Sequence, residues 1–340
     1  MTTKTRPPAF PAAHIGVLSG LEIIGDGLIK LPFLRALRAA WPTATIHWIT
    51  TKGPTVYTGA LRDTVAPLID RVHVQPSWLD GAKDGDEAAP PFDLMIDTRG
   101  RWRLALQARR HLPHQMFIAP AFRYLLSDKR PPLFAPRKKQ MIDRLLQTVE
   151  LAAGFMPEVT RRLPVTGEMM GKARRILPEG QIYVGFAPGA GNAIKKWPAE
   201  SFEKLAKLQV RMNRIPVFIL GPQEMDLYDR LFRAIPEAIF PLQAYEVWGT
   251  KELSVEQTLA IGHCLDLAVT NDSGTSHMLA AVDCPLVSLF GPTSAKKLAP
   301  RVSQSTVICA QDFGGDEMAL IPVEAVHEAV NRAIILQGKV

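Results

Sequence analysis

Short apolar runs alternate with longer amphipathic segments along the first half of the chain. Runs at 14–18, 44–50 and 92–96 are bounded by turn residues and predict strands. The segment 28–40 repeats apolar residues at helical spacing, and Trp41-Pro42 predicts the end of that helix. A further short strand and two further helices are predicted over 72–74, 102–110 and 141–153. This order predicts a parallel sheet with right-handed crossovers.

The same alternation starts again after a stretch rich in proline and glycine. Residues 155–179 read as a linker and predict a domain boundary near 160–180. Strands are then predicted over 182–187, 217–220, 267–269 and 286–290, and helices over 199–212, 225–234, 323–336 and a segment capped by Ser254. Two such series without an internal repeat predict an α/β protein of two Rossmann-like domains facing a cleft. The predicted parts are 14–165, 166–322 and a C-terminal helix within 323–340.

The stretch 269–282 is the most informative part of the second series. It begins as an apolar strand, passes through the polar turn 271–277 and restarts as an apolar helix. A helix that starts in such a turn aims free backbone N–H groups at one point, which favours an anion such as a phosphate. Ligands also bind at the carboxyl ends of the strands in open α/β sheets. The alternative, in which Ser or Asp merely caps this helix, remains open at this point.

Composition and charge narrow the class of protein. The chain of 340 residues is 47% hydrophobic, with a net charge of +7 and a pI of about 9.4, which favours acidic partners. Three distant cysteines without a CxxC pair indicate buried residues in a reducing compartment. Residues 1–11 lack the pattern of a signal peptide, and no apolar run approaches the ~20 residues of a membrane span. We therefore expect a cytoplasmic protein whose membrane contact is at most peripheral, at the inner face of the cytoplasmic membrane.

One segment carries much of the positive charge. Residues 99–144 hold twelve Lys and Arg against two acids, with aromatic residues between them. Such a run is commonly a solvated face, but it also fits a docking surface for a phosphorylated or membrane-held acceptor. No nucleic-acid-binding motif accompanies it, so nucleic acid is not an expected partner. Asp97, Arg99 and Arg123 are candidate acceptor-binding residues, although Asp97 and Arg99 could equally form only a salt bridge at the end of a strand.

Four short motifs occur in a fixed order. They are Gly25-Asp26 followed by Leu31-Pro32, Lys195-Lys-Trp-Pro198, Asp272-Ser-Gly-Thr-Ser-His277 and Phe290-Gly-Pro-Thr293. Together the set resembles glycosyltransferase family 9, the lipopolysaccharide heptosyltransferases. The resemblance implies a GT-B fold, with an acceptor-binding N-terminal domain, a domain that binds the nucleotide-sugar donor, and a C-terminal helix that crosses back. It also implies inverting transfer from a nucleotide sugar, typically ADP-heptose, onto a phosphorylated glycolipid acceptor of the lipopolysaccharide core.

The resemblance assigns roles to residues that match its motifs. It implies that Asp26 is the catalytic base, that Lys195 holds the donor phosphates and that Asp272 binds the donor sugar. The remaining donor-binding candidates are the phosphate-facing turn, a residue against the base, a ribose-binding acid and a glycine of the phosphate loop: Ser273, Gly274, His277, Leu253, Glu224 and Gly191. The chain departs from the pattern in the turn 20–24 and in Gly189-Ala-Gly191, where some members carry hydroxyl groups, so the donor's identity stays open.

Each assignment has an ordinary structural alternative. Asp26 could cap a helix, Lys195 could be an exposed charge and His277 could hydrogen-bond within the core. Asp84-Gly85-Asp86 has the spacing of a metal-binding motif, but it lies in a polar loop with no strand before it. We therefore predict neither a metal nor a cofactor. The competing functions are a nucleotide-sugar epimerase on the same scaffold, a transferase with a different donor and a non-catalytic nucleotide-sugar-binding protein.

Overall fold

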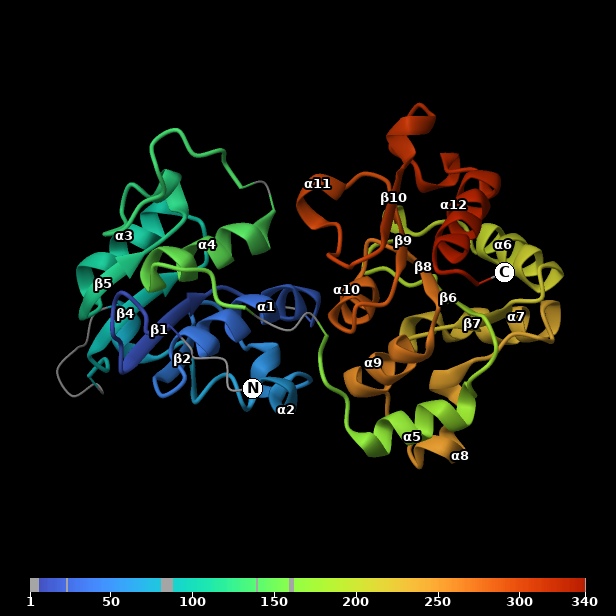
Figure 1. Ribbon diagram of the computed structural model, residues 1–340, viewed down its shortest axis with the longest axis horizontal. Coiled ribbons are helices and arrows are strands. Elements are labelled where there is room, and N and C mark those ends of the chain that lie inside the picture. The colour runs from blue at the N-terminus through green and yellow to red at the C-terminus, as the bar shows by residue number, and fades with distance from the viewer. Residues whose placement is uncertain (1–5, 23, 81–87, 139, 159–161, 340) are drawn as a thin grey trace. The chain divides into compact units, whose positions relative to one another are not determined.

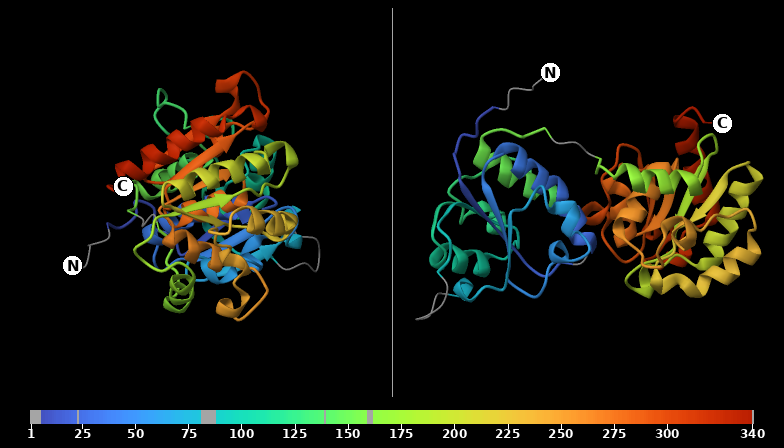
Figure 2. Two further views of the ribbon diagram at one scale, coloured as in Figure 1. Left: turned by 90° about the vertical axis from the view of Figure 1, so that its right-hand side faces the viewer. Right: turned by 90° about the horizontal axis from the view of Figure 1, so that it is seen from below.

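The computed structural model describes residues 6–22, 24–80, 88–138, 140–158 and 162–339. The chain divides into two compact units, 1–160 and 161–340, close to the predicted boundary at 165/166. Each unit contains a five-stranded parallel sheet with helices on both faces (Figure 1), and two further views show the same layers (Figure 2). The Asp84-Gly85-Asp86 loop lies outside the described residues.

The first unit is built on a sheet of order β3-β2-β1-β4-β5. Its elements are β1 (His14–Ser19), α1 (Ile24–Ala40), β2 (Thr45–Thr50), α2 (Arg62–Val65), β3 (Arg71–Val74), β4 (Phe92–Asp97), α3 (Trp102–His111), β5 (His114–Ile118) and α4 (Met141–Ala153). Leu18, Met95 and Phe117 point to the face that α3 covers, where they form one apolar cluster. Helices α1 and α4 pack against each other on the opposite face (Figure 1).

The second unit has a sheet of order β10-β9-β8-β6-β7. Its elements are α5 (Gly167–Ile176), β6 (Tyr183–Ala187), α6 (Ala199–Arg211), β7 (Ile215–Phe218), α7 (Tyr228–Ala234), α8 (Tyr245–Trp248), α9 (Val255–Cys264), β8 (Leu267–Asn271), α10 (Gly274–Ala281), β9 (Leu286–Phe290), α11 (Ala295–Leu298), β10 (Ser305–Cys309) and α12 (Val323–Leu336). Helices α6 and α12 pack together over one face, and α5, α9 and α10 pack together on the other. Short 3-10 turns complete both units.

Several predicted elements need correction. The segment 155–179 is not only a linker, because it contains α5, whose N-cap Thr166 accepts a hydrogen bond from the backbone of Met169. Its glycines are tolerated because α5 packs along α9. Strand β7 begins at Ile215, earlier than predicted, because its register follows its parallel partner β6. Strands β5 and β10 were not predicted, and the helix predicted over 225–234 begins as a 3-10 turn at 222–227.

The C-terminal helix α12 buries its apolar side in the second unit. Val326, Val330 and Ile334 are fully buried in the same cluster as the strands β6, β8 and β9. These contacts account for the helix's stability within its own unit. Its predicted return to the first unit stays a prediction.

Each sheet has one point where the direction of strand order reverses. In the first unit it lies between β1 and β4, where Leu18 is paired with Asp97. In the second it lies between β6 and β8, where Ala187 is paired with Thr270. The crevice outside the carboxyl ends of the strands at such a point is the usual ligand site of this architecture. The motifs found in the sequence follow these strands.

Candidate functional site

A buried asparagine joins the loops at the carboxyl ends of β6 and β8. The Asn271 amide donates from Nδ2 to the Pro188 carbonyl at 2.8 Å, and Asn271 Oδ1 accepts from the Trp197 backbone N–H at 3.1 Å. Trp197 is itself buried and donates from Nε1 to the Ile321 carbonyl. The loop 188–197 is therefore held against the end of β8. Asn271 was not among the residues predicted for the site from the sequence.

Asp272 and Lys195, predicted from separate motifs, meet at this point. Lys195 Nζ lies 2.8 Å from Asp272 Oδ2. The Thr293 hydroxyl, from the fourth motif, donates to the same oxygen at 2.8 Å. The Lys195 side chain is 28% exposed and that of Asp272 is 8% exposed. The ammonium group is therefore open to a solvent-borne anion while the carboxylate keeps it in place.

A second pair of charges lies beside the first. Lys196 Nζ is 3.1 Å from Glu224 Oε1, and Glu224 is buried. A Cβ added at Gly189 would lie 2.8 Å from the Glu224 carboxyl group, so a side chain at 189 would displace Glu224. Gly191, the predicted candidate, has open space around the same position. The close approach that requires glycine is thus at 189.

The turn after β8 has the features of an anion site. Ser273 stands at the N-cap of α10 but makes no capping hydrogen bond with its side chain. Its Oγ is buried and has no hydrogen-bond partner among the residues that the structure describes. Gly274 opens the helix, so the first-turn N–H groups are available to a ligand. The ordinary capping alternative therefore does not apply to Ser273.

Two further predicted residues belong to this unit. His277 lies in α10, half-buried, and burial lowers its pKa to about 4, although Asp272 acts in the opposite direction. The imidazole is therefore neutral at pH 7 and can accept a hydrogen bond at one nitrogen. Leu253 is half-buried in the loop before α9, and its role against a nucleotide base stays a prediction.

Asp26 lies in the first turn of α1, just beyond β1 at the reversal point of the first sheet. Its side chain is half-buried. The helix begins at Ile24, so Asp26 is inside the helix and not the residue that precedes it. A carboxylate in the first turn of a helix is favoured by the helix dipole. This placement is compatible with a catalytic role.

The turn between β1 and Asp26 is held by a carboxylate that the sequence analysis missed. Glu22 is buried and accepts hydrogen bonds from the Ser19 hydroxyl at 2.8 Å, the Trp48 indole at 3.0 Å and the Thr55 hydroxyl at 2.6 Å. It also forms a buried ion pair with Lys30. An acid among apolar residues in the turn 20–24 was the available signal. Glu22 fixes the segment that leads into Asp26.

Asp97 and Arg99 form the salt bridge that was one of the two predicted alternatives. Arg99 donates from Nε to Asp97 Oδ1 at 2.9 Å and from Nη2 to Asp97 Oδ2 at 2.7 Å. Both side chains are almost fully buried. Arg99 also donates to the Leu104 carbonyl at 3.0 Å, which ties the end of β4 to α3. A direct role of this pair in binding an acceptor stays a prediction.

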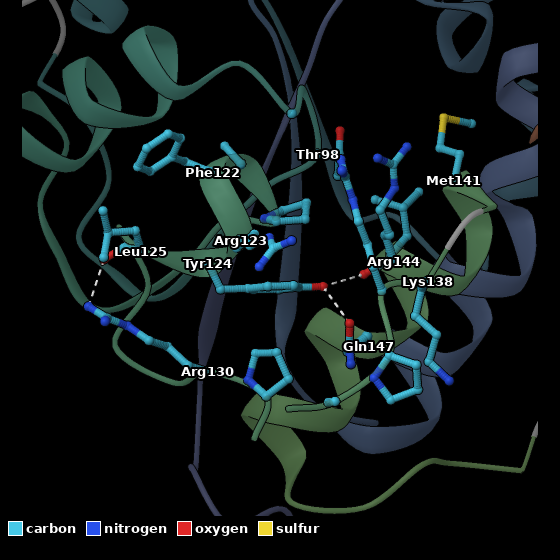
Figure 3. Close-up of a pocket in the computed structure, with 18 of the residues that line it drawn as sticks. Thr98, Phe122, Arg123, Tyr124, Leu125, Arg130, Lys138, Met141, Arg144 and Gln147 are labelled. Atoms are coloured by element: carbon cyan, nitrogen blue, oxygen red, sulfur yellow. Dashed lines mark hydrogen bonds between the residues drawn. The ribbon is translucent and has the colours of Figure 1, made fainter. Parts of the chain in front are cut away.

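A cavity of about 960 Å³ lies beside this salt bridge, within the first unit. It is lined by 98–100, 120–125, 130–133, 135–138 and the first turns of α4 (Figure 3). Arg123, a predicted acceptor-binding residue, is on its wall. Phe122, Arg123 and Tyr124 all have positive φ, at 48°, 55° and 61°, a conformation that non-glycine residues adopt at a cost.

The strained turn is held by Tyr124. Its hydroxyl donates to the Arg144 carbonyl at 3.2 Å and to Gln147 Oε1 at 3.0 Å, both on α4 (Figure 3). Burial raises the pKa of this hydroxyl, so it remains a donor throughout the physiological range. The turn therefore presents Phe122 and Arg123 outward in one arrangement.

The described residues contain neither a cluster of metal-ligating side chains nor a membrane-spanning helix. Within the described ranges, no group of three or more His, Cys, Asp or Glu side chains is placed to hold a metal ion. Of the helices in the same ranges, none has the length and apolar character that crossing a bilayer requires.

The two parallel-sheet units define the class of protein: the chain has a GT-B fold. Solved structures with this arrangement include the glycosyl transferase family 9 protein of Veillonella parvula DSM 2008, at a TM-score of 0.69, 20% identity and coverage of 95% of this chain and 97% of that one. ADP-heptose LPS heptosyltransferase II of E. coli matches with a TM-score of 0.63, 20% identity and coverage of 96% and 99%. These likenesses concern the fold.

The sequence itself identifies the family. The profile of glycosyltransferase family 9 (heptosyltransferase) matches residues 88–317, which is more than half of the chain. The protein belongs to this family. A curated relative, lipooligosaccharide heptosyltransferase 2 of Haemophilus influenzae, is 31% identical over 138 residues, covering 40% of this chain and 39% of the relative. The match thus spans about two fifths of that relative's length.

Proposed function

We propose that the protein is an inverting, metal-independent glycosyltransferase that moves heptose from ADP-heptose to a phosphorylated acceptor of the lipopolysaccharide core. Family membership supports the transferase class, and the names of the E. coli and Haemophilus influenzae proteins support the donor and the acceptor. The observation that carries the proposal is the arrangement of Lys195, Asp272 and the unpartnered Ser273 hydroxyl at one strand end.

The donor's diphosphate is the leaving group, and its growing charge needs stabilisation. The Lys195 ammonium, the Ser273 hydroxyl and the first-turn N–H groups of α10 provide fixed positive charge and donors, which lowers the barrier without a metal ion. Asp272, with one oxygen bound to Lys195 and Thr293, offers its other oxygen to the sugar hydroxyls. Glu224 and Leu253 serve the ribose and the base.

Asp26 acts as the general base on the acceptor. It takes the proton of the acceptor hydroxyl while that oxygen attacks the anomeric carbon and the bond from this carbon to the diphosphate breaks, releasing ADP. A single base, with attack opposite the leaving group, gives inversion at the anomeric carbon. The position of Asp26 in the first turn of α1 at a strand reversal point supports this role.

The acceptor is assigned to the cavity of the first unit. Its lining includes Arg99, Arg123, Arg130, Arg137, Lys138 and Arg144, with no acidic residue among the lining residues. This charge fits the phosphate groups of a glycolipid. We infer that the protein works in the cytoplasm at the inner face of the cytoplasmic membrane, where such an acceptor is accessible. An epimerase would have no use for this basic cavity, so the transferase is the better supported function.

Calorimetric titration with ADP, UDP and GDP, with and without EDTA, tests the donor. We expect binding of ADP alone, unchanged by EDTA. Selective binding of UDP or GDP would contradict the proposed donor, and loss of binding in EDTA would contradict metal independence. Asp26→Asn should reduce turnover with ADP-heptose by about 10²–10⁴-fold at unchanged ADP affinity. Full activity of this variant would exclude Asp26 as the base, and recovery of an isomerised donor would favour the epimerase.

A further inference from the structure

The segment 130–138 carries two large apolar side chains that the fold leaves uncovered. Leu133 is 89% exposed and Phe134 is 94% exposed, more than any other large hydrophobic residue in the described part of the chain. Single exposed apolar residues are common on protein surfaces, but two adjacent ones that project almost completely into solvent are not explained by packing. Leu133 lines the acceptor cavity and Phe134 follows it directly in the chain, which connects this pair with function.

The backbone places these two residues at a tip. The Ala135 N–H donates to the Pro132 carbonyl at 2.9 Å, which closes a turn with Leu133 and Phe134 at its two central positions. Pro131, Pro132 and Pro136 restrict the chain on either side. The base of the loop is held by Arg130, which donates to the Leu125 carbonyl at 2.7 Å (Figure 3). The turn, the prolines and the Arg130 contact therefore fix the loop that carries the tip.

The tip is flanked by cations on both sides. Lys129 and Arg130 precede it, Arg137 and Lys138 follow it, all four are exposed, and no acid occurs between 129 and 138. The neighbouring acid, Asp128, is engaged by Arg109 Nη2 at 2.5 Å. An apolar tip within a ring of cations matches the boundary between acyl chains and anionic headgroups, because the cations stay in the headgroup layer while the tip enters the apolar layer.

A second segment of the cavity lining has the same combination. Phe122 is 67% exposed and precedes Arg123 on the strained turn, and Leu125, 50% exposed, directly follows that turn (Figure 3). The cavity lining thus combines cations with exposed apolar side chains from two segments of the chain. An acceptor held in a bilayer by its acyl chains would contact the cationic lining while the exposed apolar side chains contact the bilayer.

We propose that Leu133 and Phe134 insert into the surface of a bilayer containing anionic phospholipid, while Lys129, Arg130, Arg137 and Lys138 contact the headgroups. The insertion holds the acceptor cavity of the first unit at the membrane surface. The insertion depends on the proposed function only through the assumption that the acceptor is held in a lipid bilayer. Membrane binding itself needs neither donor nor acceptor.

Cosedimentation of the full chain with vesicles tests the insertion. The vesicles contain phosphatidylcholine alone or phosphatidylcholine mixed with phosphatidylglycerol. We expect binding to the mixed vesicles, weakened by added salt because exposed charges are screened. The double variant L133S/F134S should bind at least about tenfold more weakly, because two apolar side chains lose their burial in the acyl layer. K129E/R137E/K138E, which leaves the Arg130 contact intact, should lose the preference for phosphatidylglycerol.

The matched control is I335S/L336S, which removes two exposed apolar residues from α12 in the second unit. It should bind vesicles as the wild type does. Equal binding by L133S/F134S and wild type, or an equal loss in the control, would overturn the proposal. So would self-association without vesicles that L133S/F134S abolishes, because the tip would then serve a second copy of the chain.

ADP titration of the same variants separates this inference from the proposed function. Loss of vesicle binding at wild-type ADP affinity supports insertion, and it also shows that the variant is folded. Vesicle binding that persists in a protein without ADP affinity would leave the insertion standing and remove the proposed donor.

Discussion

The two units each place a lysine–carboxylate pair near the carboxyl end of a central strand, and the pairs differ in exposure. In the first unit, Lys30 and Glu22 have side chains that are 9% and 0% exposed. In the second, Lys195 and Asp272 are 28% and 8% exposed. Glu22 receives donors at both oxygens, whereas the two contacts of Asp272 share Oδ2.

This difference separates a buried pair that holds the chain in place from a more accessible pair that we propose binds the donor. Glu22 accepts hydrogen bonds at both oxygens, and its pair with Lys30 is buried. Replacing Lys30 by a ligand would therefore leave the charge of Glu22 buried without compensation. Lys195 lies at the surface and can bind a phosphate at little desolvation cost while Asp272 keeps its second oxygen for a sugar. Both pairs consist of a lysine and a carboxylate, and their different accessibility decides which of them a ligand can reach.

Removing Lys30 from its buried pair with Glu22 should have the largest effect on stability. We expect Lys30→Met to lower the free energy of unfolding by about 3–5 kcal/mol, because it leaves Glu22 charged and buried. Urea unfolding followed by far-UV circular dichroism measures this. Lys207→Met, which removes a half-exposed i,i+4 partner of Glu203, is the control and should cost no more than about 1 kcal/mol. Equal losses in the two variants would refute the distinction.

Breaking the open pair should affect ligand binding more than stability. If Lys195 binds the diphosphate as proposed, Lys195→Ala removes a charge-assisted contact, and we expect ADP affinity to fall by about 10- to 100-fold, with a small change in unfolding. Lys196→Ala, whose ammonium contacts Glu224, is the neighbouring control and should reduce affinity less. Calorimetry compares the two. A larger effect at Lys196 would exchange the roles of these lysines.

Lowering the pH should reduce the stability of the fold through a buried histidine in the first unit, His47. Burial lowers the pKa of His47 to about 4, with His73 and His14 acting in the same direction. The unfolded chain takes up this proton near pH 6.5 and the folded chain does not, so stability falls between about pH 6.5 and pH 4. The slope from one such group is at most about 1.4 kcal/mol per pH unit. Urea unfolding at several pH values should give a shallower slope for His47→Gln than for the wild type, and an unchanged slope would contradict the assignment.

The smallest effect is expected at the phosphate loop. Gly189→Ala brings a Cβ to 2.8 Å from the Glu224 carboxyl, so Glu224 has to shift, and ADP affinity should fall by less than about tenfold. Gly191→Ala meets open space and should leave affinity unchanged. Calorimetry on both variants decides between them. A greater loss at Gly191 would restore the position that the sequence favoured.

Most of the fold was predictable because buried parallel strands and their covering helices leave regular apolar patterns. The end of α1 at Ala40 agrees with the stop predicted at Trp41-Pro42, whereas β8 continues to Asn271, into the predicted turn. Helix α5 was missed because its stability comes from packing on α9 and not from its own glycine-containing sequence. Strands β5 and β10 were missed because each begins with two polar residues that are not buried and therefore lacks the continuous apolar run of the central strands.

The sequence by itself determined the two α/β units, the family and the motifs, because these depend on local periodicity and on residue types in order. Only the tertiary structure decided which side chains meet. It brought Thr293 to Asp272, tied Pro188 and Trp197 to Asn271, paired Asp97 with Arg99 and enclosed Glu22. The physical reason is that parallel pairing sets the strand order, and strand order decides which loops share an edge of the sheet. Whether a charge becomes sealed or accessible then follows from the neighbours that the fold supplies.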